Sequence, residues 1–311
     1  MITTVTLNAS IDKAYHMTDA IENGHVMRVS SCRNSAGGKG LNVARVIALC
    51  GSRVTATGLV GGYNGAYLES LLDEDGISHG FGHIKGETRS CINILDPKYG
   101  STEYLEPGRQ VEPEEMLDFL ENVFPEQIRE SDVVTMSGSV PAGLGRDIYA
   151  KLTEIAKASG KRVILDTSGD LLKEGVKACP DMVKPNRDEL EALFGVKIDS
   201  VDDAVLYGKK LQEQGIPYVV ISLGGDGAAM ITEEGVFRAK SPEIEPVNTV
   251  GCGDSMVGAF AVAFEKNMPA EEALRYAVSV ASANALSPNT GDFDPEDQKK
   301  LYEGTTVTKT E

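Results

Sequence analysis

Two glycines and a carboxylate stand where a helix is expected to begin, within the run Asn248–Ser255. Apolar residues follow this run at helical spacing and predict an amphipathic helix: Val257, Phe260, Ala261 and Phe264. The first turn of a helix has backbone N–H groups without an internal partner, so it attracts anions. Gly251 and Gly253 have no side chain that would keep an anion away from those amides. Asp254 is therefore either a residue that stabilises the helix start or a base placed beside a phosphate, and this segment alone leaves both interpretations open.

A second glycine-rich segment, Ser35–Asn42, precedes another predicted helix. Gly37, Gly38 and Gly40 surround a single lysine, Lys39. Backbone amides together with one ammonium group suit a phosphate or several sugar hydroxyls. The alternative is a flexible loop with a surface lysine, but three glycines directly before a helix favour a binding site.

Three further segments carry groups that suit phosphates or a metal ion, and each also has an ordinary structural explanation. Arg89 begins a predicted strand and is suited to grip a phosphate, although an exposed strand arginine is the simpler interpretation. Asn186 and Glu189 have the spacing of a capping box, and the same amide and carboxylate could hold Mg²⁺ through waters. The glycine-rich turn at residues 222–228 follows a strand and could receive a nucleotide phosphate.

Strands and helices alternate along most of the chain, which predicts βαβ crossovers and a largely parallel sheet covered on both faces. Predicted strands cover residues 2–7, 54–60, 132–137, 162–166, 182–184 and 218–222. Predicted helices cover about residues 40–50, 66–75, 146–158, 188–194, 201–214, 270–286 and 294–303, followed by a polar tail. Binding sites in such sheets lie at the carboxyl ends of the strands.

Two segments, at about residues 11–35 and 86–106, interrupt the alternation. The first contains a strand-like run at 26–32, and the second has strands at 89–95 and 101–105 on either side of a turn. They predict a hairpin and an extra strand inserted as a lid or a dimer contact. No internal repeat or low-complexity linker is visible, so we expect one domain over residues 1–311 with a small β lid.

The composition excludes several classes of function. The 311 residues carry a net charge of −17 without a basic cluster, which disfavours nucleic-acid binding but not small phosphorylated ligands. No secretory signal and no apolar run of membrane-spanning length is visible, and five scattered cysteines favour a reduced, cytoplasmic protein. The histidines lack the spacing of a zinc site, and GxxxxGK[ST], GxGxxG, GxSxG and HExxH are missing. The two glycine-rich helix starts, with scattered Lys and Arg residues and one Asp, fit phosphoryl transfer without a P-loop.

Four motifs occur in order along the chain: Gly37–Asn42, Lys184–Glu189, Ser222–Gly224 and Thr249–Asp254. Together they resemble the signature set of the ribokinase-like (phosphofructokinase-B type) carbohydrate kinases, over essentially the whole chain. Thr6–Asp12, Gly86–Arg89 and Ser137–Pro141 narrow the resemblance to the branch that contains tagatose-6-phosphate kinase and 1-phosphofructokinase.

The resemblance implies a Rossmann-like three-layer α/β sandwich with a mostly parallel sheet, a β lid, ATP, Mg²⁺ and a homodimer formed through the lid. Asp254 would be the base that accepts a proton from the attacking sugar hydroxyl. The anion hole at the helix start would consist of Gly251, Cys252 and Gly253. The sugar phosphate would lie against Asp12, Gly38, Lys39, Asn42, Arg89, Ser137 and Gly138, with Lys39 and Arg89 towards its phosphate. The nucleotide would lie against Lys184, Asn186, Ser222, Gly224, Gly227 and Thr249, with Asn284 beside the adenine and Gly291 on a flanking loop. Glu189 would help to order Mg²⁺.

Two residues depart from the family pattern. Cys252 stands where the family usually has alanine or another small residue, and Ala9 stands where proline is usual. A thiol is small and the backbone N–H at Cys252 is unchanged, so we expect activity to survive. The second change loosens the turn before Asp12 but leaves that carboxylate in place.

The resemblance predicts phosphorylation of a ketohexose monophosphate to a bisphosphate. Residues Gly86–Cys91 favour tagatose 6-phosphate as the substrate, with fructose 1-phosphate as the alternative. A non-catalytic sugar-phosphate sensor on the same scaffold is a second class, which the intact set of Asp254, Lys184 and Glu189 disfavours. A nicotinamide-dependent oxidoreductase is a third class, which the missing GxGxxG disfavours.

Overall fold

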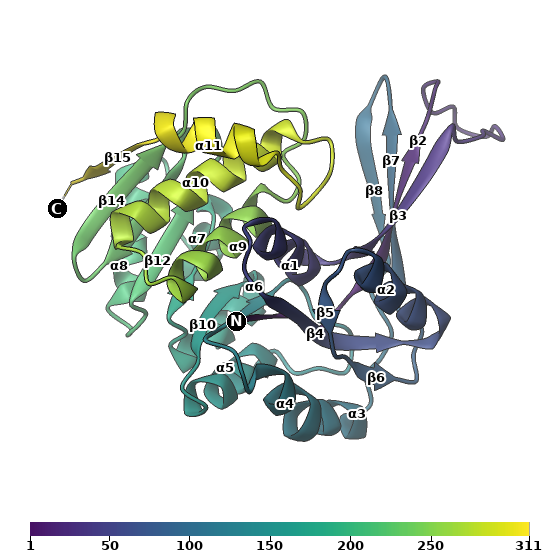
Figure 1. Ribbon diagram of the computed structural model, residues 1–311, viewed down its shortest axis with the longest axis horizontal. Coiled ribbons are helices and arrows are strands. Elements are labelled where there is room, and N and C mark those ends of the chain that lie inside the picture. Colours follow the sequence, from purple (N-terminus) through teal and green to yellow (C-terminus); the bar gives the residue numbers. More distant parts are fainter. Residues whose placement is uncertain (311) are drawn as a thin grey trace.

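The computed structural model describes residues 1–310, and its largest element is an 11-stranded sheet (Figure 1). The parallel strands are β1 (Ile2–Thr6), β4 (Val54–Gly61), β5 (Ser78–His79), β6 (Gly82–Ile84), β9 (Val133–Ser137), β10 (Arg162–Asp166), β11 (Met182–Val183) and β12 (Tyr218–Ser222). The antiparallel strands at one edge are β13 (Ala228–Thr232), β14 (Gly235–Lys240) and β15 (Thr306–Lys309).

The strand order places β1 inside the sheet, between β4 and β9. The chain first moves outward from β1 to β4 and then returns to the other side of β1 at β9. Connections therefore leave in opposite directions at this point, and in open α/β sheets such a reversal marks the ligand crevice at the carboxyl ends of the strands. All five residues of β1 are buried, as expected for a strand covered on both faces.

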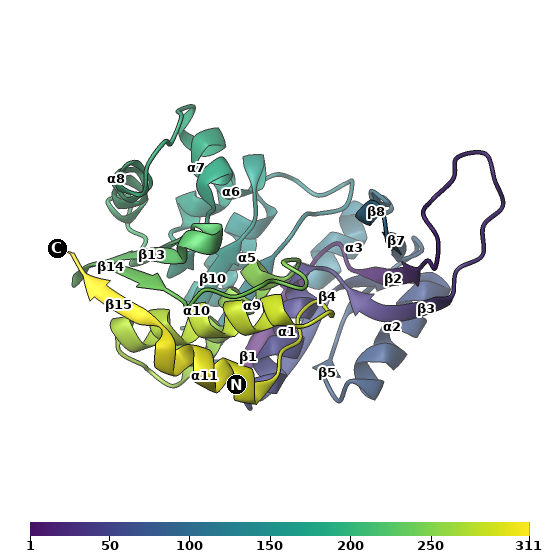
Figure 2. The same ribbon diagram turned by 90° about the horizontal axis from the view of Figure 1, so that it is seen from above.

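Helices cover both faces of the sheet and complete three layers (Figure 2). One face carries α1 (Lys39–Leu49), α2 (Gly62–Glu74), α9 (Cys252–Glu265), α10 (Ala270–Leu286) and α11 (Pro295–Gly304). The other carries α3 (Pro113–Asp118), α4 (Phe124–Ile128), α5 (Ile148–Ala158), α6 (Gly169–Gly175), α7 (Arg187–Phe194) and α8 (Val201–Gln212). The predicted α/β sandwich with a mostly parallel sheet is thus confirmed.

Helix α9 is more deeply placed than an amphipathic pattern indicates. Every residue from Asp254 to Phe264 is buried, because α9 packs against both α1 and α10 as well as the sheet. A helix that is apolar on nearly all sides belongs in the interior of a protein. The site at its N-terminus is therefore held by the best-packed part of the fold.

A smaller four-stranded sheet projects from the main body (Figure 1, upper right). Its order is β3–β2–β7–β8, with bounds β2 (Ser10–His16), β3 (Ser31–Gly37), β7 (Arg89–Asp96) and β8 (Gly100–Leu105). These strands come from the two segments predicted to interrupt the alternation. We refer to this sheet as the lid sheet.

One local prediction was wrong, and one edge strand was not predicted. The strand-like run at residues 26–32 lies mostly in a loop, where Val26 is 95% exposed, and the strand begins at Ser31. The polar tail is not free, because residues Thr306–Lys309 form β15 and pair with β14. Backbone pairing does not require apolar side chains on an edge strand, so hydrophobicity gave no sign of it. Among residues 1–310, no helix is long and apolar enough to cross a membrane.

Candidate active site

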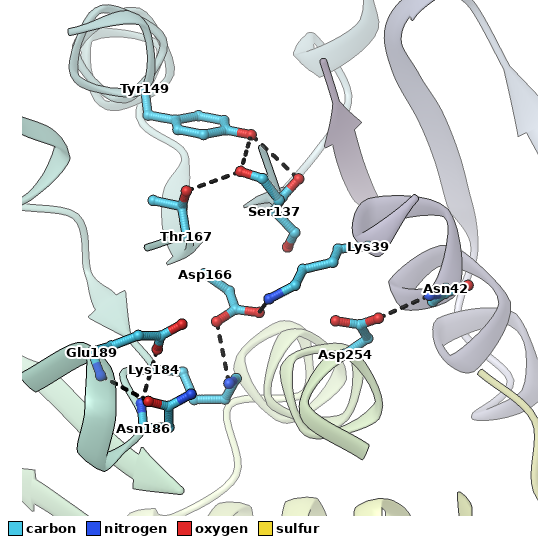
Figure 3. A network of polar contacts seen from close by, with 11 residues as sticks. Lys39, Asn42, Ser137, Tyr149, Asp166, Thr167, Lys184, Asn186, Glu189 and Asp254 are labelled. Atoms are coloured by element: carbon cyan, nitrogen blue, oxygen red, sulfur yellow. Dashed lines mark hydrogen bonds and ion pairs between the residues drawn. The ribbon is translucent and has the colours of Figure 1, made fainter. Parts of the chain in front are cut away.

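Polar side chains gather where the central parallel strands end. Ser137 and Asp166 are the last residues of β9 and β10, Lys184 directly follows β11, and Ser222 ends β12. Carboxyl ends of parallel strands share one edge of a sheet, so residues far apart in the sequence meet there. Figure 3 shows several of them around the start of α9.

The start of α9 has the geometry of an anion site. Gly251 is the N-cap and has φ +83°, and a Cβ there would lie only 2.6 Å from Thr290 Cγ2. Position 251 therefore requires glycine. A Cβ on Gly253 would lie 3.3 Å from Lys184 Nζ, so the glycine lets this ammonium group approach the helix start. First-turn amides that have no partner within the helix and a nearby cation together favour negative charge at this place.

Asp254 lies in the first turn of α9 with only 6% of its surface exposed. Its Oδ2 accepts a hydrogen bond of 2.8 Å from Asn42 Nδ2 (Figure 3). Burial raises the pKa of Asp254 to about 6, and the negative charge of Asp166 acts in the same direction, whereas Lys39, Asn42 and Lys184 oppose the rise. A carboxylate with this pKa is ionised at neutral pH and is basic enough to accept a proton from a hydroxyl group in a transition state.

Asp166 joins two cations and was not among the predicted site residues. Its Oδ1 lies 3.2 Å from Lys184 Nζ and its Oδ2 lies 3.8 Å from Lys39 Nζ, while its side chain is 2% exposed. The charge of Asp166 raises the pKa of Lys39 and so keeps that ammonium protonated. The only sequence signal for Asp166 was its place as the final residue of a buried strand.

Asp12 and Arg89 lie on the lid sheet close to the glycine-rich segment. Asp12 Oδ1 accepts a 2.6 Å hydrogen bond from Ser10 Oγ, and burial raises the pKa of Asp12. A Cβ on Gly37 would lie 2.0 Å from Asp12 Cγ, so this glycine makes room for the carboxylate. Arg89 uses Nε and Nη1 to bind the carbonyls of Asn8 and Glu106, at 3.1 and 2.7 Å. These bonds fix the guanidinium beside the turn that follows β1.

Two side-chain hydroxyl groups hold the turn after β9 by hydrogen bonds to its carbonyl oxygens. Tyr149 Oη donates to the carbonyl oxygens of Ser137 and Gly138, at 3.3 and 3.0 Å, and Thr167 Oγ1 donates to that of Gly138 at 2.9 Å (Figure 3). Gly138 has φ +98° and packs against the side chain of Lys39. Ser137 Oγ is buried and has no hydrogen-bond partner within residues 1–310.

The segment after β11 has the capping box that the spacing predicts. Glu189 N donates to Asn186 Oδ1 at 2.8 Å, and Asn186 N donates to Glu189 Oε2 at 2.9 Å. Asn186 also forms a parallel bridge with Ser222, which brings the two predicted nucleotide segments together. Beyond Ser222, Gly224 has φ +60°, and Gly227 has φ +86° with its Cα close to the β14 backbone.

Asn284 ties two loops to the start of α9. This side chain is fully buried, and its Oδ1 accepts hydrogen bonds of 3.0 Å from both Ser255 Oγ and Gly291 N. Its Nδ2 donates to Val250 O at 3.0 Å and to Cys252 Sγ at 3.5 Å. Any influence of Asn284 on a ligand therefore passes through these loops, because its own polar atoms are engaged within the protein.

Three predicted site residues remain: Thr249, Gly291 and Gly38. Thr249 O accepts a 3.4 Å bond from Cys252 N and so belongs to the turn that leads into α9. Gly291 has φ +66°, and a Cβ there would lie 3.1 Å from Asn42 Cα. Gly38 has φ +110° and packs against Thr6. The loop after α10 thus meets the first turn of α1 at Asn42.

A sequence profile of the pfkB family carbohydrate kinases matches residues 5–297. The chain belongs to this family. It is 40% identical over 291 residues to a 1-phosphofructokinase of Bacillus subtilis (strain 168), covering 94% of each chain. It is 37% identical over 306 residues to a tagatose-6-phosphate kinase of Staphylococcus epidermidis, covering 97% of each. Among solved structures, phosphofructokinase-2 from Escherichia coli in complex with potassium aligns with a TM-score of 0.91 at 31% identity, over 97% of this chain and 98% of that one.

Membership of the pfkB family confirms that the protein is an enzyme, a kinase that uses ATP to phosphorylate a carbohydrate. In this pfkB protein the sequence motifs from both ends of the chain lie close together in two sets of contacts (Figure 3): Asn42 binds Asp254, and Lys39 and Lys184 both pair with Asp166. The charges of Lys39 and Lys184 act on Asp254 and oppose the rise of its pKa. Asp166 was not predicted, and neither were Tyr149 and Thr167, which hold the turn at Gly138.

Proposed function

We propose that this enzyme transfers the γ-phosphoryl group of ATP to a hydroxyl group of a ketohexose monophosphate, which yields a sugar bisphosphate and ADP. The observation that carries the proposal is the ionisable carboxylate of Asp254, buried in the first turn of α9 with Lys39 and Lys184 close by.

The chemistry follows from these groups. Asp254 accepts the proton of the attacking hydroxyl as the bond between sugar oxygen and phosphorus forms and the bond between phosphorus and the ADP oxygen breaks. The amides of Gly251, Cys252 and Gly253 stabilise the charge on the transferring group. Lys184, held by Asp166 and lying over Gly253, adds positive charge at the same place.

The two ligands approach from different elements. The sugar phosphate lies between the lid sheet and the start of α1, against Asp12, Gly38, Asn42, Ser137 and Gly138. Lys39 and Arg89 neutralise its existing phosphate. The nucleotide lies against Asn186, Ser222, Gly224, Gly227 and Thr249, with its base towards the loops that Asn284 and Gly291 fix.

The acidic side chains fit a magnesium ion that keeps most of its waters. Among residues 1–310, no group of three or more His, Cys, Asp and Glu side chains could enclose a metal ion. Mg²⁺ needs only one or two carboxylates when substrate phosphates supply further oxygens. Glu189 uses Oε2 for its capping bond, so Oε1 is the atom suited to bind a magnesium-bound water. When bound with ATP, the ion supplies charge neutralisation on the phosphates.

Two acceptors fit this proposal, and they differ in which end of the sugar already carries phosphate. Residues Gly86–Cys91 favour tagatose 6-phosphate, which would give tagatose 1,6-bisphosphate. The 40% identity to a 1-phosphofructokinase favours fructose 1-phosphate, which would give fructose 1,6-bisphosphate.

A coupled ADP-release assay over hexoses and hexose monophosphates tests the proposal. We expect activity on a ketohexose monophosphate and loss of that activity in Asp254→Asn. A variant that phosphorylates sugar near the wild-type rate would show that Asp254 is not the base. Values of kcat/KM decide between the two acceptors, and about a hundredfold preference for fructose 1-phosphate, worth about 2.7 kcal/mol, would reject tagatose 6-phosphate.

We also propose that two copies pair through the lid sheet. Ile92 and Ile94 on β7 and Tyr104 on β8 share the face of the lid sheet opposite Asp12, and Tyr104 is 60% exposed. An apolar sheet face is suited to cover another. Light scattering should report twice the chain mass of 33.2 kDa, and Tyr104→Glu should halve it. A monomeric wild type would refute the pairing.

A further inference from the structure

Arg45 lies on α1 one turn after Asn42 and makes three directed contacts. Its Nη1 donates to Asn42 Oδ1 at 3.1 Å, its Nη2 donates to the carbonyl oxygen of Ala36, and its Nε donates to Asp75 Oδ2 at 3.0 Å. The side chain is 16% exposed. A guanidinium held at three of its nitrogens has a fixed orientation, which a flexible ammonium would not have.

The contact with Asn42 determines which way the Asn42 amide faces. A guanidinium has donors only, so it must face the amide oxygen of Asn42. The amide nitrogen is then left to donate to Asp254 Oδ2, 2.8 Å away. If the amide turned over, two donors would meet at Arg45 and two acceptors would meet at Asp254. Arg45 therefore orients the carboxylate of Asp254 through Asn42.

The contact with Ala36 connects the same guanidinium to the sugar side of the cleft. Ala36 belongs to β3, immediately before the Gly37–Gly38 segment. Gly37 lies against the carboxylate of Asp12, whose pKa rise the charge of Arg45 opposes. One side chain thus bridges the lid strand that lies beside Asp12 and the amide that orients Asp254.

We propose that Arg45 is a positioning residue for phosphoryl transfer, which fixes the Asn42 amide against Asp254 and holds lid strand β3 in register with α1. This inference rests on the proposed role of Asp254 as the base. Arg45 touches neither the sugar nor ATP in this arrangement. Its effect on kcat passes through Asn42, whereas its bond to the Ala36 carbonyl supports β3.

A double-mutant cycle tests the proposal. Arg45→Met keeps much of the volume of the side chain and removes every donor. We expect it to lower kcat about tenfold, the effect of losing one hydrogen bond to a charged group, with the KM for ATP within about twofold of wild type. Asn42→Ala should lower kcat by a similar or larger factor, and adding Arg45→Met to it should lower kcat by less than about twofold more. The proposal would be overturned if the two substitutions lowered kcat by factors that multiply in the double variant, or if Arg45→Met left kcat unchanged.

Two controls separate positioning from loss of stability. Arg275 is also a half-buried arginine, with Nη1 bound to Thr305 O at 2.7 Å and Nη2 3.4 Å from Glu271, but it joins α10 to the turn after α11. Arg275→Met should lower the melting temperature without lowering kcat. Asp75→Ala removes the outer, 42% exposed partner of Arg45 and should also leave kcat unchanged. An equal fall of kcat in both controls would assign the Arg45 effect to general stability and overturn the proposal.

The same assay distinguishes this proposal from the assignment of the base. Should Arg45→Met fold poorly, Arg45→Lys keeps the charge without the forked geometry, and we expect it to restore the fold but not the full kcat. Full activity in Asp254→Asn would reject the base itself. An inactive Asp254→Asn beside a fully active Arg45→Lys and Arg45→Met would reject only the role of Arg45.

Discussion

Lowering the pH should remove activity at a value set by the burial of Asp254. Its pKa rises from 3.8 to about 6 because the carboxylate is enclosed at the start of α9, with Asp166 nearby and with Lys39 and Lys184 limiting the rise. The base must be ionised to accept a proton. Activity is therefore expected to be full above this pKa and to fall as the pH drops through it.

The size of the effect follows from the titration. With a pKa of about 6, the ionised fraction of Asp254 falls about fourfold between about pH 7.5 and about pH 5.5. A carboxylate with the ordinary value of 3.8 would lose only about 2% of its ionised form over the same range. The two cases are easily separated by a rate measurement.

The assay is kcat/KM for the sugar phosphate with saturating ATP and magnesium, because kcat/KM reports the ionisation of the free enzyme. An isoelectric point of about 4.7 makes measurements below about pH 5 vulnerable to precipitation, so the series should stop above it. The sugar phosphate also titrates near this range. Dividing each wild-type value by the residual value of Asp254→Asn at the same pH cancels that ionisation.

The expected ratio falls about fourfold from about pH 7.5 to about pH 5.5. A ratio that stays flat over this range would refute the reasoning, since it would mean either that Asp254 is not the base or that its burial does not raise its pKa. A fall of the same size in Asp254→Glu, measured against the same reference, would be consistent with a carboxylate base.

Three other perturbations have defined outcomes. Asp254→Asn should raise the melting temperature at about pH 8. The pKa of Asp254 is higher in the folded than in the unfolded state, so ionised Asp254 lowers the free energy of unfolding above pH 6, by about 3 kcal/mol at most. The gain in melting temperature should shrink towards pH 5.5, and a gain independent of pH would contradict this reasoning. Arg89→Ala should raise the KM for the sugar phosphate at least about tenfold more than the KM for ATP, and equal effects would place Arg89 away from the sugar phosphate. Gly227→Ala should lower the melting temperature and raise the KM for ATP, since its φ is +86° and a Cβ would lie 2.0 Å from a carbonyl oxygen of β14. The matched control Gly225→Ala, where a Cβ meets no atom within 4 Å, should change neither quantity, and similar losses in both variants would show that the clash is not the cause.

The hydrophobic pattern predicted most of the central strands and of the helices that cover them, but it did not predict the helical segment at residues 113–128 or strands β13 and β14. Arg162–Asp166 and Tyr218–Ser222 are strands with the predicted bounds, and Ala270–Leu286 is a helix with the predicted bounds. The hydrophobic pattern did not predict strands that are stabilised mainly by backbone hydrogen bonds to a neighbouring strand. Three of the four residues 306–309 are polar and all four are half-exposed or exposed, yet they pair with β14. The lid strand begins at Ser31 although the more apolar run lies before it.

Some residues of the candidate site were also predictable from local sequence, and others were not. Glycine-rich helix starts are visible in a sequence, because glycine at a helix N-terminus has a local physical meaning. Asp166 and Tyr149 had no such local signal. Asp166 matters because β10 ends beside Lys184 and Lys39, and Tyr149 matters because α5 places its hydroxyl under the turn after β9.

The sequence by itself determined the class of sheet, the two glycine-rich helix starts and the carbohydrate kinase family. These depend on spacing along the chain, which is what a sequence records. Only the tertiary structure decided that Asp254 is enclosed with a raised pKa, that Asp166 holds both lysines, and that Arg45 reaches Asp254 through Asn42. The physical reason is that desolvation and charge pairing depend on distances in space between residues from separate parts of the chain, and those distances arise only when β1, β9, β10 and α9 meet at one edge of the sheet.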